Sequence, residues 1–487
     1  MPVFRTIAVA VASALCTAAT AFAADYDPSA PLDVSAGLSL AGCTAGASAE
    51  FASAYDGAEV EPQVAVNPLN PLEMIGASQQ DRWPDGGARG LTSWISHDGG
   101  ASWSKLPDVP WSACQGGPER FGRVTDPWVS YDAAGNAYFI GQPIDSAELG
   151  LSAVSITSFD RQSGAWRAPQ ILIEDIGARG AFNDKISVTG DPTRPGYAYA
   201  TWLRGDYPNG GRQSENADLH SFAYRGLPMI SRTTDGGLTW SKPQPIRQSN
   251  AYFQGNQIAV LPDGTLLNVA AVLFRGSGRQ PNDNGVFMTV IRSNDAGRTW
   301  SGPIKVAPLG TIGTYNPDDG SPLRVGDYLP DIAVDMDAGA AYIVWSDAQG
   351  GSVNHVVLSR SIDGGRHWSS PTPISDPAVE SFNHAVSVTE SGSVTVLYYD
   401  IRNNTAAGGL PTDVWLTHSE DGGRTFEGDD HLYGPFDFLL APESAGRGPF
   451  VGDYVGLEKT TADDLVAFYA VAVADNDADI ISQLATK

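Results

Sequence analysis

The chain is short of lysine, of cysteine and of long apolar runs. It has 487 residues, and its 30 basic residues, only 6 of them lysine, stand against 56 acidic ones, which gives a formal net charge of −26. So acidic a protein disfavours nucleic acid and anionic membrane surfaces as partners. Beyond the N-terminal two dozen residues no apolar run is long enough for a transmembrane helix, so we expect no membrane span. We also expect a monomer.

The sequence also lacks the short motifs of several enzyme classes. It contains no His-Glu-x-x-His, no Cys-x-x-Cys, no glycine-rich phosphate loop and no Gly-x-Ser-x-Gly. Zinc protease, redox, nucleotide-dependent and α/β-hydrolase chemistry therefore have no support, and we expect no required cofactor and no dedicated metal site. The acidic pairs Asp318-Asp319 and Asp429-Asp430 either bind Ca²⁺ or are solvated surface charge.

The N-terminal residues predict a secretory signal peptide at residues 1–24. One arginine precedes an apolar core from Ile7 to about Ala19, and Ala21-Phe22-Ala23 has the small residues of a cleavage site. We therefore expect a secreted protein, either extracellular or periplasmic. After cleavage two cysteines remain, Cys43 and Cys114, which either form one disulfide that ties the N-terminal arm to the first repeat or stay as free thiols.

The most distinctive feature of the chain is an eight-residue turn that recurs five times. Each copy has Ser or Thr, then Asp, Gly and a closing Trp or Phe in the same register, and each joins two β-rich runs. The copies are Ser96–Trp103, Thr233–Trp240, Ser293–Trp300, Ser361–Trp368 and Ser419–Phe426. The carboxylate can accept hydrogen bonds from backbone N–H groups of its own loop, and glycine supplies the positive φ. We predict a structural role for the five aspartates, Asp98, Asp235, Asp295, Asp363 and Asp421.

A longer repeat of about 55–75 residues underlies these turns. Its first strands begin near Glu61, Asp126, Asn183, Gly255, Leu329, Asn383 and Gly452. Repeats of this kind, all-β and rich in glycine and proline, predict a β-propeller, here with seven blades of four antiparallel strands or alternatively six. The last repeat stops at its third strand. We expect the missing strand to come from residues around Ser48–Tyr55, with residues 25–45 a loose N-terminal arm and residues 46–487 the propeller.

The five turns are similar to the Asp-box, or BNR repeat, of the sialidase-like β-propellers. This resemblance implies that ligands bind over the central tunnel, on the face opposite the boxes. The starts of the first strands, the ends of the second strands and the connections between blades reach that face. The polar residues placed there include Glu61, Asp126, Asp184, Lys185, Asp453 and Arg324.

Sialidases hold the substrate carboxylate with three arginines and use a tyrosine nucleophile assisted by a glutamate, with an aspartate as acid/base. Their first arginine lies in a (Phe/Tyr)-Arg-Ile-Pro motif, where this chain has Val60-Glu61-Pro62-Gln63, so that arginine is missing. The resemblance implies Arg82 as the second arginine, Arg402 or Arg447 as the third, Asp85 or Asp81 as the acid/base and Tyr454 as the nucleophile.

In architecture the chain also resembles secreted seven-bladed lyases and hydrolases that act on rhamnose–glucuronate caps. A lyase must neutralise the uronate carboxylate and then abstract the neighbouring C–H proton. Arg204, Arg225 or Arg275 would neutralise the charge, and His220, His384 or Tyr207 would be the base. Arg123 and Asp331 complete the predicted substrate-binding residues.

Three hypotheses about function follow. The first is a secreted glycoside hydrolase that removes a terminal acidic sugar, linked through sialic acid or a uronate, from a glycan or polysaccharide. The second is a lyase that cleaves a rhamnose–glucuronate linkage by β-elimination. The third is a propeller that binds glycan or protein without catalysis.

Overall fold

The computed structural model describes residues 25–145, 150–176, 181–206, 225–274, 285–311, 313–405 and 408–487. Within these ranges the regular elements are β-strands, apart from two single-turn 3-10 helices, η1 (Ala113–Gln115) and η6 (Phe438–Leu440). No described helix has the length and hydropathy needed to cross a bilayer. Predicted residues Tyr207, His220 and Arg275, and the predicted signal peptide, lie outside the described residues.

The described strands group into seven antiparallel units, each counted from the centre outward. The first three units are β3 (Val60–Val66), β4 (Met74–Arg82), β5 (Ala88–Ser96) and β6 (Ser104–Lys105); β7 (Arg123–Tyr131), β8 (Ala137–Ile144), β9 (Leu151–Asp160), β10 (Ala165–Trp166) and β11 (Gln170–Ile176); and β12 (Ala181–Gly190), β13 (Ala198–Asp206), β14 (Arg225–Thr233) and β15 (Gln244–Pro245).

The next three units have the same order. They are β16 (Tyr252–Val260), β17 (Leu266–Phe274), β18 (Gly285–Ser293) and β19 (Ile304–Pro308); β22 (Asp331–Val334), β23 (Ala341–Asp347), β24 (His355–Ser361) and β25 (Thr372–Pro373); and β26 (Ser381–Val388), β27 (Val394–Asp400), β28 (Pro411–Ser419) and β29 (Glu427–Asp437). The last unit contains β32 (Gly456–Lys459), β33 (Leu465–Ala474) and β34 (Asp477–Thr486). Two short hairpins, β20 (Thr314–Tyr315) with β21 (Pro322–Leu323) and β30 (Glu443–Ser444) with β31 (Gly448–Pro449), lie in connections between units.

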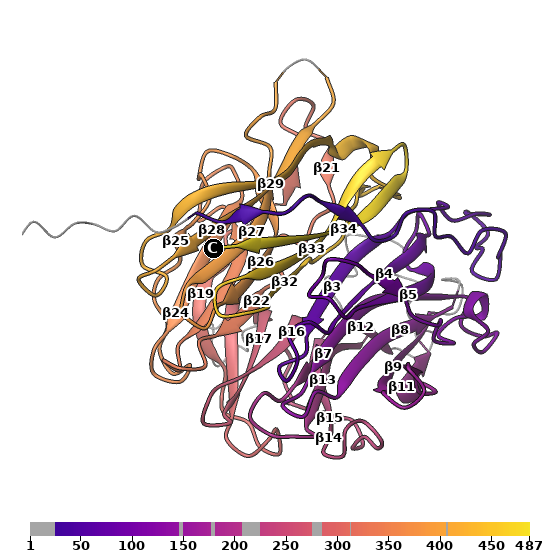
Figure 1. Cartoon of the computed structure of the whole chain (residues 1–487), viewed down its shortest axis with the longest axis horizontal. Helices are drawn as coiled ribbons and strands as arrows, with labels where there is room; N and C mark the ends of the chain where they lie inside the picture. Colours follow the sequence, from indigo (N-terminus) through magenta and orange to yellow (C-terminus); the bar gives the residue numbers. More distant parts are fainter. Residues whose placement is uncertain are drawn as a thin grey trace, which may run out of the picture.

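The first strands of the units form a closed ring. Strands β3, β7, β12, β16, β22, β26 and β32 contact one another in that order, and β32 returns to contact β3. Their labels lie together near the middle of the molecule in Figure 1. Radially stacked antiparallel sheets around a central channel are the architecture of a β-propeller, so the predicted fold class is confirmed.

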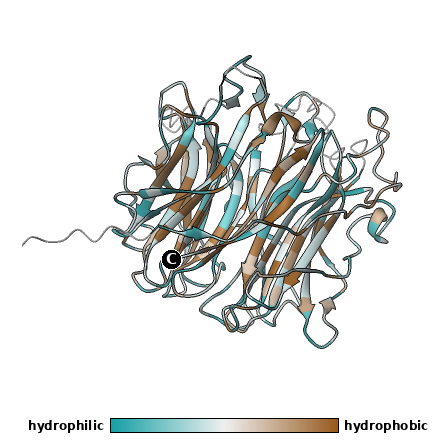
Figure 2. Cartoon of the chain, turned by 45° about the horizontal axis from the view of Figure 1, so that its top comes forward, coloured by the Kyte–Doolittle hydropathy of each residue, from teal (hydrophilic) through white to brown (hydrophobic). Residues whose placement is uncertain are grey.

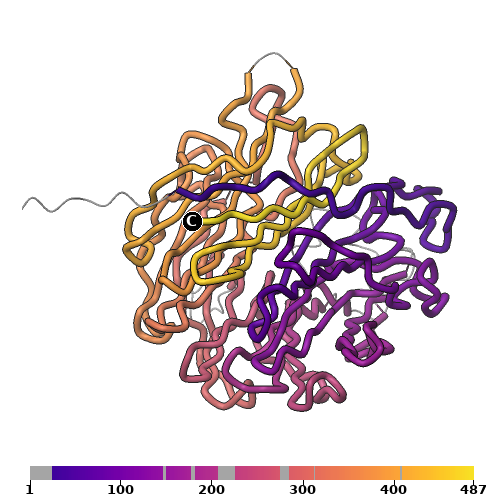
Figure 3. Tube along the Cα trace, viewed as in Figure 1, coloured from indigo at the N-terminus to yellow at the C-terminus, as the bar shows by residue number. Residues whose placement is uncertain are grey.

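The ring closes through the N-terminal arm, but not through the segment that the sequence suggested. Strand β1 (Asp27–Pro28) and strand β2 (Leu32–Asp33) both pair with β34 and supply the outer edge of the last unit. Figure 3 shows this indigo segment running over the yellow C-terminal strands. The prediction of Ser48–Tyr55 was therefore wrong, and residues 25–45 are not a loose arm, because their backbone completes an otherwise unpaired sheet edge.

The second half of the arm is fastened to the first unit. Cys43 and Cys114 form a disulfide across a sequence separation of 71 residues. Gly57 N and Leu40 N both donate hydrogen bonds to the carboxylate of Asp81, at 3.0 and 2.6 Å. The arm thus bridges the last unit and the first, where a closed ring is most easily opened.

The five predicted turns have one hydrogen-bond pattern. In the first, Asp98 accepts hydrogen bonds from Ser96 Oγ at 2.8 Å and from Ser102 N and Oγ at 2.9 and 2.6 Å. The carboxylates of Asp235, Asp295, Asp363 and Asp421 likewise accept from the Ser or Thr hydroxyl two residues before and from the backbone N–H four residues after. All five aspartates therefore hold loop structure, as predicted.

The apolar core lies between neighbouring units. Side chains from β8, β9, β12 and β13, including Tyr138, Val154 and Trp202, form one buried cluster, and similar clusters follow around the ring. In Figure 2 the hydrophobic colour runs along the strands. With apolar residues used to pack unit against unit, the polar residues of the first strands are left facing the channel and its mouth.

Candidate active site

A repeated backbone irregularity marks the start of the first strands. The strand pairing shifts register there in β3, β7, β12, β16 and β26. In each shift one residue has positive φ: Glu61, Asp126, Lys185, Gly255 and Asn383, at 57°, 54°, 49°, 68° and 49°. Non-glycine residues adopt this conformation at a cost, which persists only where the surroundings enforce it. Four of the five are not glycine, and three of these four, Glu61, Asp126 and Lys185, are charged and lie at one end of the channel.

Two connections between units run against each other at the same end. Arg324 N donates to Pro449 O at 3.2 Å, which joins the segment before β22 to the segment before β32. A Cβ on Gly326 would lie 2.1 Å from Asp453 O, and one on Gly448 would lie 1.9 Å from Pro322 O. Only glycine fits these close approaches. They set Arg324 and Arg447 on adjacent segments.

Two arginines pack on Phe450, and a third, Arg447, lies near enough for its charge to act on Arg82. The guanidinium carbons of Arg82 and Arg324 lie 4.2 and 3.9 Å from the centre of its ring. Arg82 is 1% exposed and donates from Nη1 to Gln79 Oε1 at 3.0 Å, whereas its Nε and Nη2 have no hydrogen-bond partner among the described residues. Burial and the charges of Arg324 and Arg447 lower the pKa of Arg82 to about 9, so it remains a cation at neutral pH.

Acidic groups face these cations. Asp453 makes an ion pair with Lys185, and its Oδ2 also lies 3.5 Å from Arg324 Nη2. Burial alone would raise the pKa of Asp453, but Lys185 and Arg324 hold it well below the usual range. Burial and the charge of Asp126 raise the pKa of Glu61 to about 7. Burial raises that of Asp184 to about 6, although the nearby Lys185 opposes the shift.

Tyr454 lies among these carboxylates. Burial and the negative charges of Glu61, Asp126 and Asp453 raise its pKa well above the usual value, with a hydrogen bond to Glu61 adding to the effect. Its hydroxyl lies 3.2 Å from Pro127 O, and its ring centre lies 5.1 Å from that of Trp128. A neutral tyrosine next to a carboxyl group that titrates near neutrality has the arrangement that a nucleophile and its general base require.

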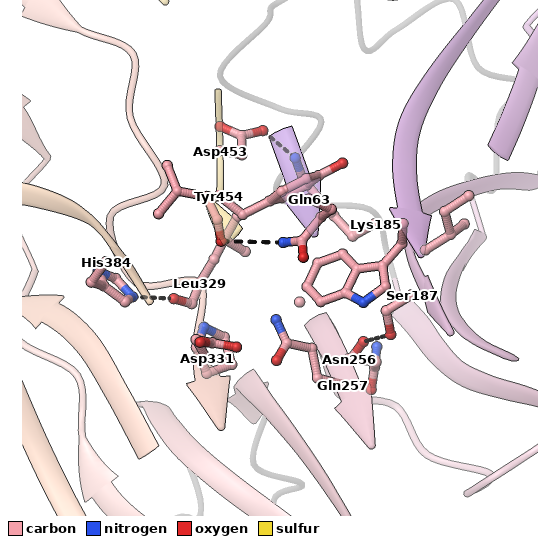
Figure 4. Close-up of a pocket in the computed structure, with 15 residues that line it drawn as sticks. Gln63, Lys185, Ser187, Asn256, Gln257, Leu329, Asp331, His384, Asp453 and Tyr454 are labelled. Carbon is pink, nitrogen blue, oxygen red and sulfur yellow. Dashed lines mark hydrogen bonds and ion pairs between the residues drawn. The ribbon is translucent and has the colours of Figure 1, made fainter. Parts of the chain in front are cut away.

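A small cavity lies in the channel below Tyr454 (Figure 4). It measures about 30 Å³, room for about two water molecules, and Gln63, Gln257 and Asp331 give it polar walls. Figure 4 shows Asp453 and Lys185 joined at its upper edge, with His384 on its side. A sugar ring does not fit in this space, so a ligand of that size would sit above it, at the mouth that carries the arginines.

Comparison with known proteins bears on the turns and on the fold. A family model of the BNR/Asp-box repeat matches residues 94–105, which contain the first turn. Together with the five equivalent hydrogen-bond patterns, this match decides the identity of the repeat. The chain is an Asp-box β-propeller. No curated protein sequence matches it.

Several solved structures resemble this Asp-box propeller. The Hadza microbial sialidase Hz136 is 14% identical, covers 85% of this chain and 76% of its own, and has a TM-score of 0.47. The Penicillium chrysogenum α-L-arabinanase is 10% identical over 87% of this chain and 92% of its own, with a TM-score of 0.43. The Ruminococcus gnavus intramolecular trans-sialidase is 14% identical over 89% and 95%, with a TM-score of 0.42.

The structure brings together three of the predicted site residues. Arg82, Arg447 and Tyr454 all belong to one cluster at the channel mouth. The other members of this channel-mouth cluster are Arg324, Lys185, Asp126, Asp184 and Asp453. Glu61, which stands where the sialidase arginine is missing, belongs to the same cluster and contributes the opposite charge.

Asp85 and Arg123, predicted as catalytic and substrate-binding residues, are paired with each other and contact the N-terminal arm. Arg123 Nη1 lies 2.6 Å from Asp85 Oδ1, and Arg123 Nε donates to Gly46 O at 2.7 Å. Ser48 Oγ also donates to Asp85, at 3.2 Å. Arg123 is 1% exposed. These contacts clamp the N-terminal arm onto the first unit, and they use up the polar atoms that a substrate would need.

Other predicted substrate-binding arginines are already paired with acids. Arg204 makes a two-point ion pair with Asp175 at 2.7 and 2.8 Å, and Arg225 pairs with Asp206. Arg402 Nε lies 2.6 Å from the buried Asp400, and its guanidinium carbon lies 4.0 Å from the ring centre of Trp415. None of the contacts described for these three arginines involves the channel-mouth cluster.

The predicted base His384 is also committed to internal contacts. Its Nε2 donates to Leu329 O at 2.8 Å, so Nδ1 accepts from Ser346 Oγ at 3.2 Å. Burial lowers the pKa of His384 to about 4, so the ring is neutral and lacks a free lone pair at the mouth. Asp331 lines the cavity and accepts a hydrogen bond from Val386 N at 2.8 Å, while burial raises its pKa to about 6.

The acidic pairs considered as Ca²⁺ ligands have protein partners. Asp319 accepts from Ser321 N at 2.8 Å, Asp429 pairs with Arg402 at 2.8 Å, and Asp430 accepts from Tyr26 N at 3.0 Å. In the part of the chain that the structure describes, no group of three His, Cys, Asp or Glu side chains is arranged to hold a metal ion.

Sequence reasoning placed Glu61, Lys185, Asp453 and Arg324 on the correct face but did not select them. Three of the four stand at or beside the starts of first strands, and aligning the seven repeats at those starts shows a charged residue in the first three. These aligned charged residues were the signal in the sequence that could have identified the site. The pairing of Lys185 with Asp453, 268 residues away, has no counterpart in the sequence.

Proposed function

We propose that this Asp-box propeller is a secreted glycoside hydrolase that removes a terminal acidic sugar from a glycan. The observation that carries the proposal is that Tyr454 and Glu61 lie at the same channel mouth as a cluster of three arginines. Guanidinium groups bind carboxylates with paired hydrogen bonds, and Arg82 has unused donors there. A neutral nucleophile suits an anionic sugar, because a carboxylate nucleophile would be repelled by the substrate.

The chemistry follows from the protonation states. Arg324 and Arg447 hold the sugar carboxylate, with Arg82 behind them. The Tyr454 oxygen attacks the anomeric carbon and gives its proton to Glu61, while Asp184, with its pKa near 6, protonates the leaving oxygen as the glycosidic bond breaks. Water then attacks the anomeric carbon of the glycosyl-tyrosine and gives its proton to Asp184. Tyr454 recovers its proton from Glu61, so both residues return to their starting states.

The described residues favour hydrolysis over β-elimination. Of the lyase candidates that the structure describes, Arg204 and Arg225 are paired with acids, and both nitrogens of His384 are occupied. The other candidates, Tyr207, His220 and Arg275, lie outside the described residues. A binding propeller without catalysis would have no use for a tyrosine buried against a carboxyl group of raised pKa, an arrangement typical of reactive groups.

The test is a product assay on the mature chain with two substrates, a sialylated glycan and an arabinogalactan capped with rhamnose–glucuronate. Released sugar is measured together with the ultraviolet absorbance of an unsaturated uronate. We expect sugar without new absorbance, and Tyr454→Phe should lower the rate by about 10³-fold or more. Tyr315→Phe, on an exposed tyrosine, is the matched control.

Each alternative outcome is informative. New absorbance would establish the lyase and contradict hydrolysis. Turnover of neither substrate, by a chain that is folded and monodisperse, would favour the binding propeller. A Tyr454→Phe variant that remained fully active would remove tyrosine from the mechanism.

A further inference from the structure

We infer that Lys185 is a positioning residue of the channel mouth. By pairing with Asp453 it ties the first strand of the third unit to the segment that carries Tyr454. It also holds in place the Asp453 carboxylate, which Arg324 contacts as well. The catalytic consequence rests on the proposed function. The tie itself rests on geometry alone.

Lys185 reaches Asp453 because of an unusual backbone. It occupies the left-handed position in the bulge of β12, with φ 49°. Its side chain is 13% exposed, and that of Asp453 is 8% exposed. A non-glycine residue held in this conformation is maintained by its surroundings, and the ion pair with Asp453 is the contact that its own side chain contributes.

Asp453 is the point where three parts of the site meet. It precedes Tyr454 in sequence, so fixing its side chain fixes the backbone from which Tyr454 projects. Its Oδ2 receives both Lys185 Nζ and, at 3.5 Å, Arg324 Nη2. Its carbonyl oxygen packs on Gly326 so closely that a Cβ there would lie 2.1 Å away. Movement of Asp453 would therefore displace the proposed nucleophile and one carboxylate-binding arginine together.

Lys185 also balances the charge at the mouth. The acids that face it are Glu61 from β3, Asp126 from β7, Asp184 from its own strand and Asp453 from the last connection. The other cations near these acids are Arg82, Arg324 and Arg447, so four acids meet four cations. Removal of Lys185 leaves four acids against three arginines. Carboxyl groups that lose a nearby positive charge bind protons more tightly.

This arrangement makes a distinctive prediction. A residue that only stabilised the fold would change the amount of active protein but not the pH at which it works. Lys185 lowers the pKa of both Glu61, the proposed base, and Asp184, the proposed acid. Its loss should therefore move both limbs of the pH–rate profile to higher pH.

The experiment compares Lys185→Gln, Lys185→Arg and Lys242→Gln, the last being the same change at an exposed surface lysine. We expect Lys185→Gln to lower kcat/KM by about 10²-fold, the size of effect that a small misplacement of reacting groups produces. Its pH–rate profile should move up by about one pH unit. Lys185→Arg should keep the wild-type profile, and Lys242→Gln should behave as wild type.

A double-mutant cycle with Asp453→Asn, read by urea unfolding, tests the tie without substrate. If Lys185 acts through Asp453, Lys185→Gln should cost far less stability in the Asp453→Asn background than in the wild type. Additive losses, or an active Lys185→Gln variant with an unmoved profile, would overturn the inference. A wild-type chain that cleaves neither substrate would instead overturn the proposed function and the catalytic role of Lys185, while the cycle would still report on the tie.

Discussion

The guanidinium carbon of Arg82 lies 4.2 Å from the ring centre of Phe450, in an interior where both side chains are at most 1% exposed. Burial of a guanidinium group is unfavourable unless its charge is compensated, and an aromatic face compensates part of it. The guanidinium carbon of Arg324 also lies close to this ring, 3.9 Å from its centre. One apolar ring thus allows two like charges to point into the same site.

Phe450→Leu should destabilise the protein more than its lost volume explains. We expect a decrease of about 2–4 kcal/mol in the free energy of unfolding, from lost packing and lost cation–π attraction. Phe436→Leu is the control, since Phe436 is buried among aromatic rings and not beside an arginine. Urea unfolding of both variants measures the difference. Equal losses would mean that the ring acts by packing alone.

The proposed hydrolysis should have a bell-shaped pH dependence with its maximum between about pH 6 and 7. Activity needs Glu61 ionised, so it falls as the pH drops below about 7, and it needs Asp184 protonated, so it falls as the pH rises above about 6. Because the groups interact, the two limbs belong to the site as a whole. Initial rates between pH 4 and 9 measure the profile. Glu61→Gln should abolish the acid limb along with most of the activity.

Stability should increase as the pH falls from 8 towards 5. Burial raises the pKa of Asp327, Glu380 and Asp479 to about 7 in the folded chain, above their unfolded values. Such groups contribute stability that is fully present below the unfolded pKa and is lost as the pH rises through the folded pKa. The Tm at pH 5 should exceed that at pH 8, and Asp327→Asn with Glu380→Gln should flatten the dependence. A Tm that rises with pH in this range would contradict the prediction.

Removal of the disulfide should loosen the arm. Cys43→Ala with Cys114→Ala should lower the free energy of unfolding by about 2–4 kcal/mol, because the crosslink closes a long loop. Proteolysis should then cut within residues 34–58 before the rest of the propeller. A reductant should loosen the arm of the wild type in the same way. It should have no effect on the double variant, which serves as the control. An arm equally resistant in both would show that its hydrogen bonds suffice.

Asp85→Asn should separate the clamp from catalysis. The change breaks a mostly buried ion pair with Arg123, so we expect a loss of about 3–5 kcal/mol in the free energy of unfolding. The value of kcat for folded protein should stay within about threefold of wild type, because Asp85 contacts the arm. A large fall in kcat with unchanged stability would instead restore Asp85 as the acid/base that the sialidase resemblance suggested.

Local patterns in the sequence were enough to predict the repeat and its turns. The hydrogen bonds of the Asp-box join residues at most four positions apart, as between Asp98 and Ser102. A short stretch of sequence is therefore enough to predict its structure. Alternation of apolar residues within each repeat then required that sheets stack on sheets, and a propeller followed. The same logic placed Arg82, Arg447 and Tyr454 on the correct face, because blade topology assigns a face to each end of a strand.

The tertiary structure alone decided which strand closes the ring and which charges meet. The closing strands Asp27–Pro28 and Leu32–Asp33 are only two residues long each, too short to show periodicity, and they act through backbone hydrogen bonds to β34 that any sequence can make. The pairing of Lys185 with Asp453 depends on the ring bringing the third and seventh units to one mouth. Opposite charges attract over a few ångströms in space, whatever their separation along the chain. No sequence spacing therefore predicts such a pair, and only the folded ring decides which charges meet.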